Sequence, residues 1–238
     1  MTNFKICFAA IIMLFGSIAV TFAQTPNKLT SKEKQNGWQL LFDGKTFDGW
    51  KKLADTGWVI KDGELVAQSF TDGKQKDIIT INQFENFELS VDFKISKLTN
   101  SGIKYLVIDT YPGHKNSFLG LEYQIVDNVN FIYPERGSYR TLASLYDLIP
   151  ADTRDTVLLN TWNAAKIIVK GNHIEHWLNG RLVVKYNKNT EEFKVSVEDS
   201  KYKNLENFGK NAKGHILLQN EGTPIAFRNI KIRPLPSL

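Results

Sequence analysis

The most regular stretch of this sequence is Phe87-Glu88-Leu89-Ser90-Val91-Asp92-Phe93-Lys94-Ile95. Apolar and polar residues alternate strictly along it. Successive side chains of a β-strand point to opposite faces, so this alternation predicts a strand over residues 84–95 with one face in a core and the other outside it. Strands of this kind build antiparallel sheets that are covered on one side. Between residues 38 and 238 we find no long segment with the period of an amphipathic helix.

Shorter runs of the same type lie on both sides of this stretch and are separated by Gly, Asn and Asp. Asp62-Gly63 and Asn179-Gly180 each stand between two runs, and both pairs favour hairpin turns because they tolerate a positive φ. The other predicted strands cover residues 38–42, 58–60, 64–67, 78–81, 103–108, 121–126, 164–170, 173–178, 181–186, 215–219 and 225–232. Short strands at this spacing predict an all-β fold, a two-sheet antiparallel β-sandwich.

Two polar segments do not fit this strand pattern. Residues 24–37 contain Pro26 and are predicted to form a flexible leader or one short helical turn. Residues 188–213 are polar and charged, and we expect a long surface loop with a short helix at most. A single sandwich domain is therefore predicted over residues 38–238, since sandwiches of about 200–250 residues are common.

The first 23 residues differ from the rest of the chain. Lys5 is their only charged residue, residues 6–20 are apolar, and small residues occur within 21–23. This layout predicts a secretory signal peptide over residues 1–23 and export to the periplasm or the extracellular space. The apolar run is short for a transmembrane helix, so we expect no stable membrane insertion after cleavage, and an uncleaved N-terminal anchor is the alternative. Cleavage would remove Cys7, the only cysteine, and would exclude disulfides, thiolate catalysis and Cys-ligated zinc.

The composition is that of a globular protein with a mixed-charge surface. Hydrophobic residues make up 42% of the chain, charged residues 23%, and the formal net charge is +5. Because basic and acidic residues are interspersed and no Lys/Arg block occurs, the charge predicts a solvated surface and no nucleic-acid partner. The sequence makes no prediction of the oligomeric state.

Eight segments of the chain, in order, resemble signatures of the 3-keto-disaccharide hydrolase family. They are residues 37–50 (GWQLLFDGKTFDGW), 100–103 (NSGI), 120–128 (GLEYQIVDN), 145–150 (LYDLIP), 162–163 (WN), 174–180 (IEHWLNG), 214–219 (GHILLQ) and 227–230 (FRNI). The resemblance implies a concanavalin-A-like jelly roll, export, and cleavage of sugars oxidised at C3. Two positions depart from the family pattern: the strand after Gly102 carries Lys104 and lacks an Arg at its end, and Asn220-Glu221 replaces Asp-His.

Glu122 and Gln124 are the central candidates for chemistry. Their spacing puts both side chains on one face of a strand, with Leu121 and Tyr123 on the other. A carboxylate beside an amide can hold sugar hydroxyls, and the carboxylate can also move a proton. The alternative is the polar face of an edge strand. Asp127 follows where this strand ends and is predicted to bind substrate.

Further candidates lie on other predicted strands and loops. Lys104 is predicted to polarise a ketone, or to be a solvated surface lysine. His176 is predicted as an acid or base, with a structural histidine as the alternative. Tyr146 and Asp147 fall in the segment that resembles the family's cleft loop, and they are predicted, with Glu221, to bind substrate.

Ordinary glycosidases place two carboxylates across the scissile bond, whereas this strand has Glu122-x-Gln124. A ketone at C3 acidifies the proton at C2, so one base and one oxyanion stabiliser suffice for β-elimination of the C1 substituent, with water adding later. Glu122 or His176 is predicted as the base, and Lys104 or Gln124 as the stabiliser. The alternatives are a non-catalytic carbohydrate-binding module and an ordinary glycoside hydrolase whose second acid is Asp147 or Glu221.

The predicted scheme uses carbohydrate as substrate and no cofactor. The four histidines are scattered through the sequence and do not have the spacing of a metal site. A calcium ion bound by loop oxygens, which is common among sandwich lectins and glucanases, stays open as an alternative.

The mature protein should begin at or near Gln24, because the signal-peptide layout ends at residue 23. N-terminal sequencing of protein recovered from the periplasm or the medium tests this expectation. Recovery of the intact chain, Met1 included, in the membrane fraction would contradict it.

Overall fold

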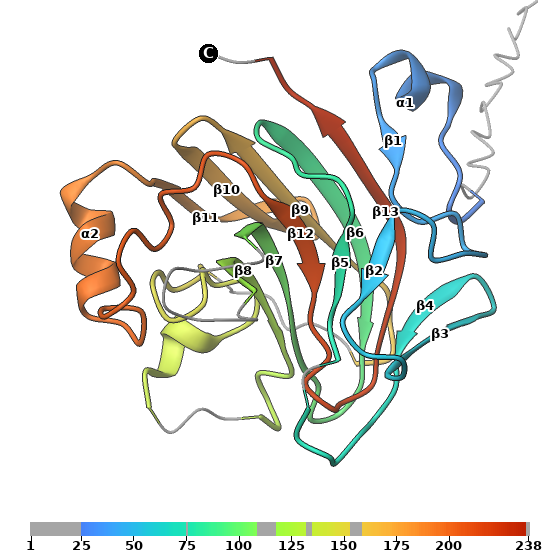
Figure 1. The fold of residues 1–238 in the computed structure, drawn as a ribbon, viewed down its shortest axis with the longest axis horizontal. Helices are drawn as coiled ribbons and strands as arrows, with labels where there is room; N and C mark the ends of the chain where they lie inside the picture. The colour runs from blue at the N-terminus through green and yellow to red at the C-terminus, as the bar shows by residue number, and fades with distance from the viewer. Residues whose placement is uncertain (1–24, 75, 109–117, 132–134, 153–158, 237–238) are drawn as a thin grey trace, which may run out of the picture.

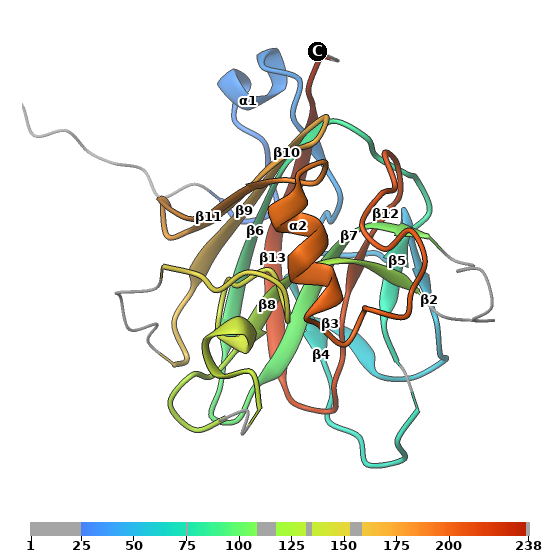
Figure 2. The ribbon, with the colours of Figure 1, turned by 90° about the vertical axis from the view of Figure 1, so that its left-hand side faces the viewer.

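The alternation of residues 87–95 is realised in β6 (Phe87–Ile95), in which every second residue is buried. The computed structural model describes residues 25–74, 76–108, 118–131, 135–152 and 159–236. It consists of two antiparallel sheets that pack face to face, as the edge-on view in Figure 2 shows. The predicted all-β two-sheet sandwich is therefore confirmed.

The larger, eight-stranded sheet has the order β11-β10-β9-β6-β13-β4-β3, with β1 paired to β13 (Figure 1). Its remaining strands are β1 (Gln39–Leu40), β3 (Trp58–Lys61), β4 (Glu64–Ala67), β9 (Asn163–Lys170), β10 (His173–Leu178), β11 (Arg181–Asn187) and β13 (Ile225–Pro234).

The five-stranded sheet has the order β2-β5-β12-β7-β8 and carries the candidate site. Its strands are β2 (Trp50–Lys52), β5 (Ile78–Thr80), β7 (Asn100–Ile108), β8 (Leu119–Val126) and β12 (His215–Leu218). Neighbours in this sheet come from distant parts of the chain, because β12 pairs with both β5 and β7. β2 lies outside the predicted strands, and its three residues are too few to show an alternation.

The two α-helices of the described residues lie in the two polar segments. α2 (Glu191–Glu198) falls in residues 188–213, and its N-cap Thr190 accepts a hydrogen bond from the Phe193 backbone. A short 3₁₀ helix, η1 (Gly137–Arg140), precedes the 141–149 loop. None of the helices in the described ranges is long and apolar enough to span a membrane.

α1 (Ser31–Gln35) falls in the segment predicted as a flexible leader or a helical turn, and Thr30 and Glu33 form a capping box at its start. Ahead of it, the Asn27 N–H donates to Asn229 Oδ1 at 2.6 Å, which ties the leader to β13. Residues 1–23 lie outside the described residues, so their role as a signal peptide stays a prediction.

His176 of β10 is fully buried between the sheets. Its Nδ1 lies 3.0 Å from the Ala143 carbonyl, which can only accept, so Nδ1 carries the proton and Nε2 accepts from the Tyr105 hydroxyl at 2.8 Å. The Tyr105 hydroxyl also bonds the Tyr186 hydroxyl at 2.8 Å. Burial lowers the pKa of His176 to about 4, which keeps the ring neutral. This position fits the structural alternative for His176 better than a role as acid or base, because both ring nitrogens are engaged inside the core.

Stability should fall as the pH drops from about 6.5 towards 4, because His176 takes up a proton in the unfolded chain at its ordinary pKa of 6.5 but resists it when buried. Replacing His176 with Phe should remove this dependence. It should also cost about 2–4 kcal/mol at pH 7.5, since Tyr105 and Ala143 lose their buried partner. Urea unfolding of both proteins from pH 4 to 8 measures the difference. If the free energy of unfolding of His176→Phe falls just as steeply between pH 6.5 and 4, the buried imidazole is not the cause of the acid sensitivity.

Candidate active site on the outer face of the five-stranded sheet

A row of side chains crosses the five-stranded sheet on its outer face, which is the face turned away from the eight-stranded sheet. Glu122 of β8 lies opposite Lys104 of β7, Lys104 lies opposite Leu217 of β12, and Leu217 lies opposite Ile79 of β5. Directly opposed residues of antiparallel strands project to the same side. Strand pairing therefore places Glu122 and Lys104 on the same face of the sheet.

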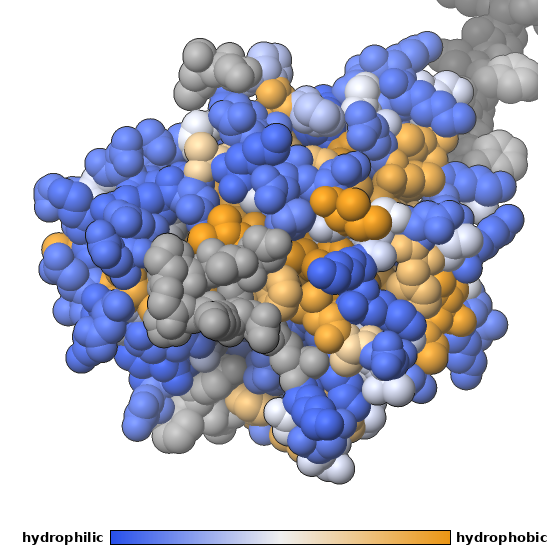
Figure 3. All heavy atoms as spheres, in the orientation of Figure 1, coloured by the Kyte–Doolittle hydropathy of each residue, from blue (hydrophilic) through white to orange (hydrophobic). Residues whose placement is uncertain are grey.

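The rest of the outer face is mixed in character. Ile79, Val107 and Leu217 form a small apolar cluster separate from the main core. In the orientation of Figure 3 this side of the molecule faces the viewer, and apolar surface appears among hydrophilic side chains. Such a mixture suits a sugar, which presents both C–H surfaces and hydroxyl groups.

Gly102 of β7 opens the space in which two polar side chains converge. A Cβ atom at this glycine would lie 2.3 Å from Gln219 Oε1 and 2.7 Å from Glu122 Oε1. Both side chains therefore fold over the bare backbone of Gly102 from opposite sides, Glu122 from β8 and Gln219 from the end of β12. The missing side chain at position 102 brings a carboxylate and an amide together.

The Glu122 carboxyl is 5% exposed and stands among four charged groups. Burial raises its pKa to about 7; the positive charges of Lys104 and Lys201 lower the pKa, and the negative charges of Glu221 and Asp77 raise it further. A carboxyl group that titrates near neutrality can take up a proton and release it again under ordinary conditions. Glu122 thus has the properties of a general base.

Lys104 is the half-buried cation beside Glu122 in the same row. Within the described part of the chain, its ammonium group makes no hydrogen bond or ion pair. Its N–H groups are therefore available to an oxygen atom of a bound molecule.

Gln124 and Glu221 lie close to this row. Gln124 shares the outer face of β8 with Glu122, and its amide donates to Asn100 Oδ1 at 3.1 Å. Glu221 follows β12 and accepts a hydrogen bond from Gln219 at 3.3 Å. Burial, and then the Asp77 charge, raise the pKa of Glu221. Both residues lie near Glu122, and their role in binding substrate stays a prediction.

Two predicted substrate-binding carboxylates are instead engaged by the protein itself. Asp127 accepts hydrogen bonds from the backbone of Leu98 and Val129, and so it organises the turn after β8. Asp147 is fully buried and accepts from Arg140 Nε at 2.6 Å and from the Lys201 backbone at 2.8 Å. These positions fit roles as structural anchors.

Tyr146, the residue before Asp147, does reach the site. Its backbone N–H donates to the Glu122 carbonyl at 3.0 Å, and the Lys201 ammonium lies 4.3 Å from the centre of its ring. The Arg140 guanidinium also lies over this ring, 5.5 Å from its centre, so two cations contact the Tyr146 ring.

The structure adds Lys201, Tyr202, Gln219 and Asp77 to the predicted residues. Gln219 could have been found from the sequence, because alternation along 215–219 turns Ile216 and Leu218 inward and Gln219 outward. No comparable signal marks Lys201, which is one of many lysines in a charged segment. Among the residues that the structure describes, no group of three His, Cys, Asp or Glu could hold a metal ion, and loop-bound calcium stays a prediction.

Comparison with known proteins relates this chain to proteins named for carbohydrate chemistry. The model of a family described as "3-keto-alpha-glucoside-1,2-lyase-like domain" matches residues 37–233. A 3-keto-disaccharide hydrolase of Bacteroides thetaiotaomicron is 33% identical over 229 residues, covering 84% of this chain and 79% of that protein. The crystal structure of a candidate glycosyl hydrolase from Parabacteroides distasonis superposes with a TM-score of 0.80 at 29% identity, covering 89% of this chain and 100% of the other. Carbohydrate-binding module CBM66 from Bacillus subtilis shares the fold, with a TM-score of 0.50 at 13% identity, covering 78% of this chain and 95% of the module.

Replacing Gly102 with Ala should cost about 1–2 kcal/mol of stability while displacing Glu122 and Gln219, because the nearest atoms to the new methyl group belong to side chains, which can rotate, and not to the backbone. Gly214→Ala is the matched control. A Cβ there would lie 2.3 Å from the Leu106 backbone, which cannot yield cheaply, so a loss of several kcal/mol is expected. Urea unfolding compares the two variants, and equal losses would contradict this account of Gly102.

Proposed function

The chain belongs to the family of 3-keto-alpha-glucoside-1,2-lyase-like domains, and on that premise we propose that it cleaves the glycosidic bond of 3-keto-glycosides by β-elimination followed by hydration. The observation that carries the proposal is the buried Glu122 carboxyl, with a pKa of about 7 and a lysine directly opposite it across the strands.

The chemistry begins at C2 of the oxidised sugar. A base removes the C2 proton, and the electron pair of that C–H bond forms an enolate with the C3 ketone. When the enolate collapses, a double bond forms between C1 and C2, the bond from C1 to the glycosidic oxygen breaks, and the leaving group takes up a proton. Water then adds across the C1–C2 double bond, so the net change is hydrolysis.

Glu122 is the proposed base because a general base works best when its pKa lies near the working pH. Lys104 is the proposed oxyanion stabiliser. Its unoccupied N–H groups, next to Glu122, suit the negative charge that develops on the C3 oxygen. Gln124 and Glu221 are proposed to hold sugar hydroxyls, and Tyr146 to stack on the ring.

Two other functions make different demands on the same face. An ordinary glycoside hydrolase needs a second acid, and Glu221, whose pKa is also raised, is the nearest candidate. A binding module needs only the hydrogen-bonding groups. Matched 3-keto and unoxidised disaccharides separate the three: cleavage of the keto form alone supports elimination, cleavage of both supports ordinary hydrolysis, and binding without turnover supports a binding module.

The proposed location is the periplasm or the extracellular space, and it rests on the signal peptide predicted over residues 1–23. Oxidation of the sugar at C3 would then have to take place in the same compartment, or before the sugar enters it.

Changing Glu122 to Gln should reduce kcat on a 3-keto-glycoside by about 10²–10⁴-fold, because the amide keeps the shape but cannot accept the C2 proton. Glu64→Gln, a carboxylate on the other sheet paired with Lys94, is the control and should retain activity. Full activity in Glu122→Gln would exclude Glu122 as the base.

The same variant should be more stable than the natural protein above pH 7. The folded pKa of Glu122 is raised from 4.5 to about 7, so natural stability falls as the pH rises through that window, and the amide escapes this loss. The gain at pH 8 is on the order of 2–3 kcal/mol. Urea unfolding at pH 5 and pH 8 measures it, and an equal difference at both pH values would argue against an unfavourable buried charge.

A further inference from the structure

We propose that Lys201 is a positioning residue of the active site, which supplies a fixed positive charge near the Glu122 carboxylate, and that Asp147 and the Tyr146 ring hold Lys201 in place for this purpose. This proposal deepens the function proposed above and rests on it. It concerns a lysine that sequence patterns did not single out and a carboxylate that had been predicted to touch substrate.

The first contact joins the 141–149 loop to β8 at the position of the proposed base. The Tyr146 backbone N–H donates to the Glu122 carbonyl at 3.0 Å. Ala143, in the same loop, donates its N–H to the Gln124 carbonyl at 2.8 Å, and its own carbonyl contacts the buried His176 ring. The loop is therefore held along the part of β8 that carries Glu122 and Gln124.

The second contact joins this loop to the segment after α2. One oxygen of Asp147 accepts from the Lys201 backbone N–H at 2.8 Å, and the other accepts from Arg140 Nε at 2.6 Å. Arg136 contributes a further ion pair at 3.4 Å. A fully buried carboxylate with these partners is costly to move, since any shift would leave a buried charge unpaired.

The third contact joins the Lys201 side chain to Tyr146, the residue of the first contact. The Lys201 ammonium lies 4.3 Å from the ring centre of Tyr146 and 5.1 Å from that of Tyr202, a cation–π arrangement. The contacts from Glu122 to Tyr146, from Asp147 to Lys201, and from Lys201 back to Tyr146 thus form a closed circuit. This circuit holds an exposed lysine in a defined position on the Tyr146 ring, and Tyr146 is itself bonded to the backbone of the proposed base.

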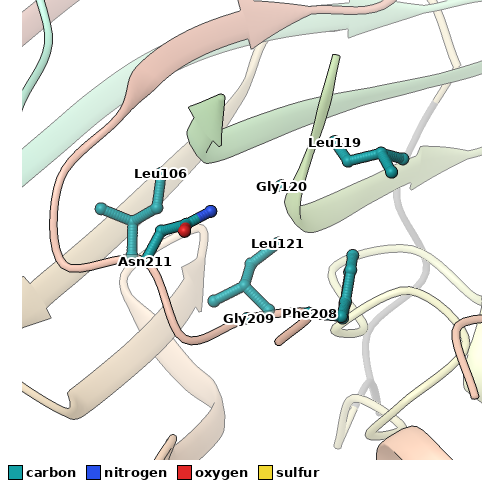
Figure 4. Close-up of a pocket in the computed structure, with 7 residues that line it drawn as sticks. All are labelled: Leu106, Leu119, Gly120, Leu121, Phe208, Gly209 and Asn211. Atoms are coloured by element: carbon teal, nitrogen blue, oxygen red, sulfur yellow. The ribbon is translucent and has the colours of Figure 1, made fainter. Parts of the chain in front are cut away.

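The segment that carries Lys201 is also fastened at its far end. The rings of Tyr202 and Phe208 stack with centroids 3.9 Å apart. Gly209 packs against β8, and a Cβ there would lie 3.4 Å from Leu121 Cδ2. Figure 4 shows Leu121, Phe208 and Gly209 around one small pocket between β8 and this segment. Leu121 directly precedes Glu122, so both ends of the segment are tied to the same strand.

The charges around Glu122 define what Lys201 does there. Lys104 on β7 and Lys201 favour the carboxylate, while Glu221 after β12 and Asp77 before β5 oppose it. The Glu122 charge acts in turn on Lys201, whose pKa burial lowers and this carboxylate raises. Arg140 and Asp147 also act on Lys201, the first lowering and the second raising its pKa. Without the Lys201 charge, Lys104 would be the one remaining cation of these four groups that favours the ionised form of Glu122, and Glu221 and Asp77 would still oppose it.

The two lysines therefore have separate tasks. The Lys104 ammonium group makes no hydrogen bond or ion pair within the described residues and is available to substrate, whereas Lys201 is held by rings and by a backbone anchor. A base that is protonated at the working pH cannot accept the C2 proton, so Lys201 extends activity toward lower pH.

The test is Lys201→Met, which keeps the aliphatic length and removes the charge. We expect the acid limb of the kcat/KM profile on a 3-keto-glucoside to move to higher pH by about 0.5–1 unit, with kcat at pH 9 within a few-fold of the natural protein. Asp147→Asn should move it in the same direction. Lys203→Met, an exposed lysine two residues further on, is the control and should leave the profile unchanged.

A ¹³C NMR titration of the Glu122 carboxyl without substrate separates this proposal from the proposed function. The Glu122 pKa should rise in Lys201→Met, whether or not 3-keto-glycosides are cleaved. If the pKa rises and the natural protein turns over no 3-keto-glycoside, the proposed function fails and the link between Lys201 and Glu122 stands. An unchanged Glu122 titration in folded Lys201→Met overturns the link, and so does loss of activity at every pH, which would make Lys201 a substrate contact.

Discussion

The packing of Leu121, Tyr123 and Ile125 into the space between the sheets is the constraint on which the site depends. These residues are almost completely buried, and a strand that commits one face to the core must turn every other residue the opposite way. Glu122 and Gln124 therefore face outward together. A slip of one residue in the register of β8 would bury the carboxylate in the core. The burial of the apolar face of β8 that stabilises the sandwich therefore also fixes the direction of the Glu122 side chain.

Two buried titratable groups act on stability in opposite directions. His176 remains neutral in the core and favours folding as the pH rises from 4 to 6.5, whereas Glu122 resists ionisation and disfavours folding as the pH rises from 4.5 to about 7. Their effects oppose each other where the two ranges overlap. His176 connects the sheets to the Ala143 loop, while the raised pKa of Glu122 is a cost to stability at neutral pH of the kind that clusters at functional sites.

The outer face is assembled in two layers. The strands supply Glu122, Lys104 and the bare backbone of Gly102, and the loops at 141–149 and 199–209 supply the residues that hold these groups in place. Asp147 joins the two loops, and its neighbour Tyr146 joins them to β8. In this arrangement a rigid sheet carries the proposed chemistry, and loops that differ more readily between relatives adjust its electrostatics.

Much of this architecture is determined by the sequence alone. Alternation in 87–95 and 121–126, with hairpin turns such as Asn179-Gly180, specifies the strands, and spacing specifies that Glu122 and Gln124 share a face, because both features are local properties of the backbone. The alternation of apolar and polar residues does not determine which strands become neighbours in a sheet. Tertiary packing decided the rest, since it depends on contacts between segments far apart in the chain. It placed Lys104 opposite Glu122 and turned His176 inward. It also made Asp147 the anchor of a loop and brought Lys201 towards the Glu122 carboxylate.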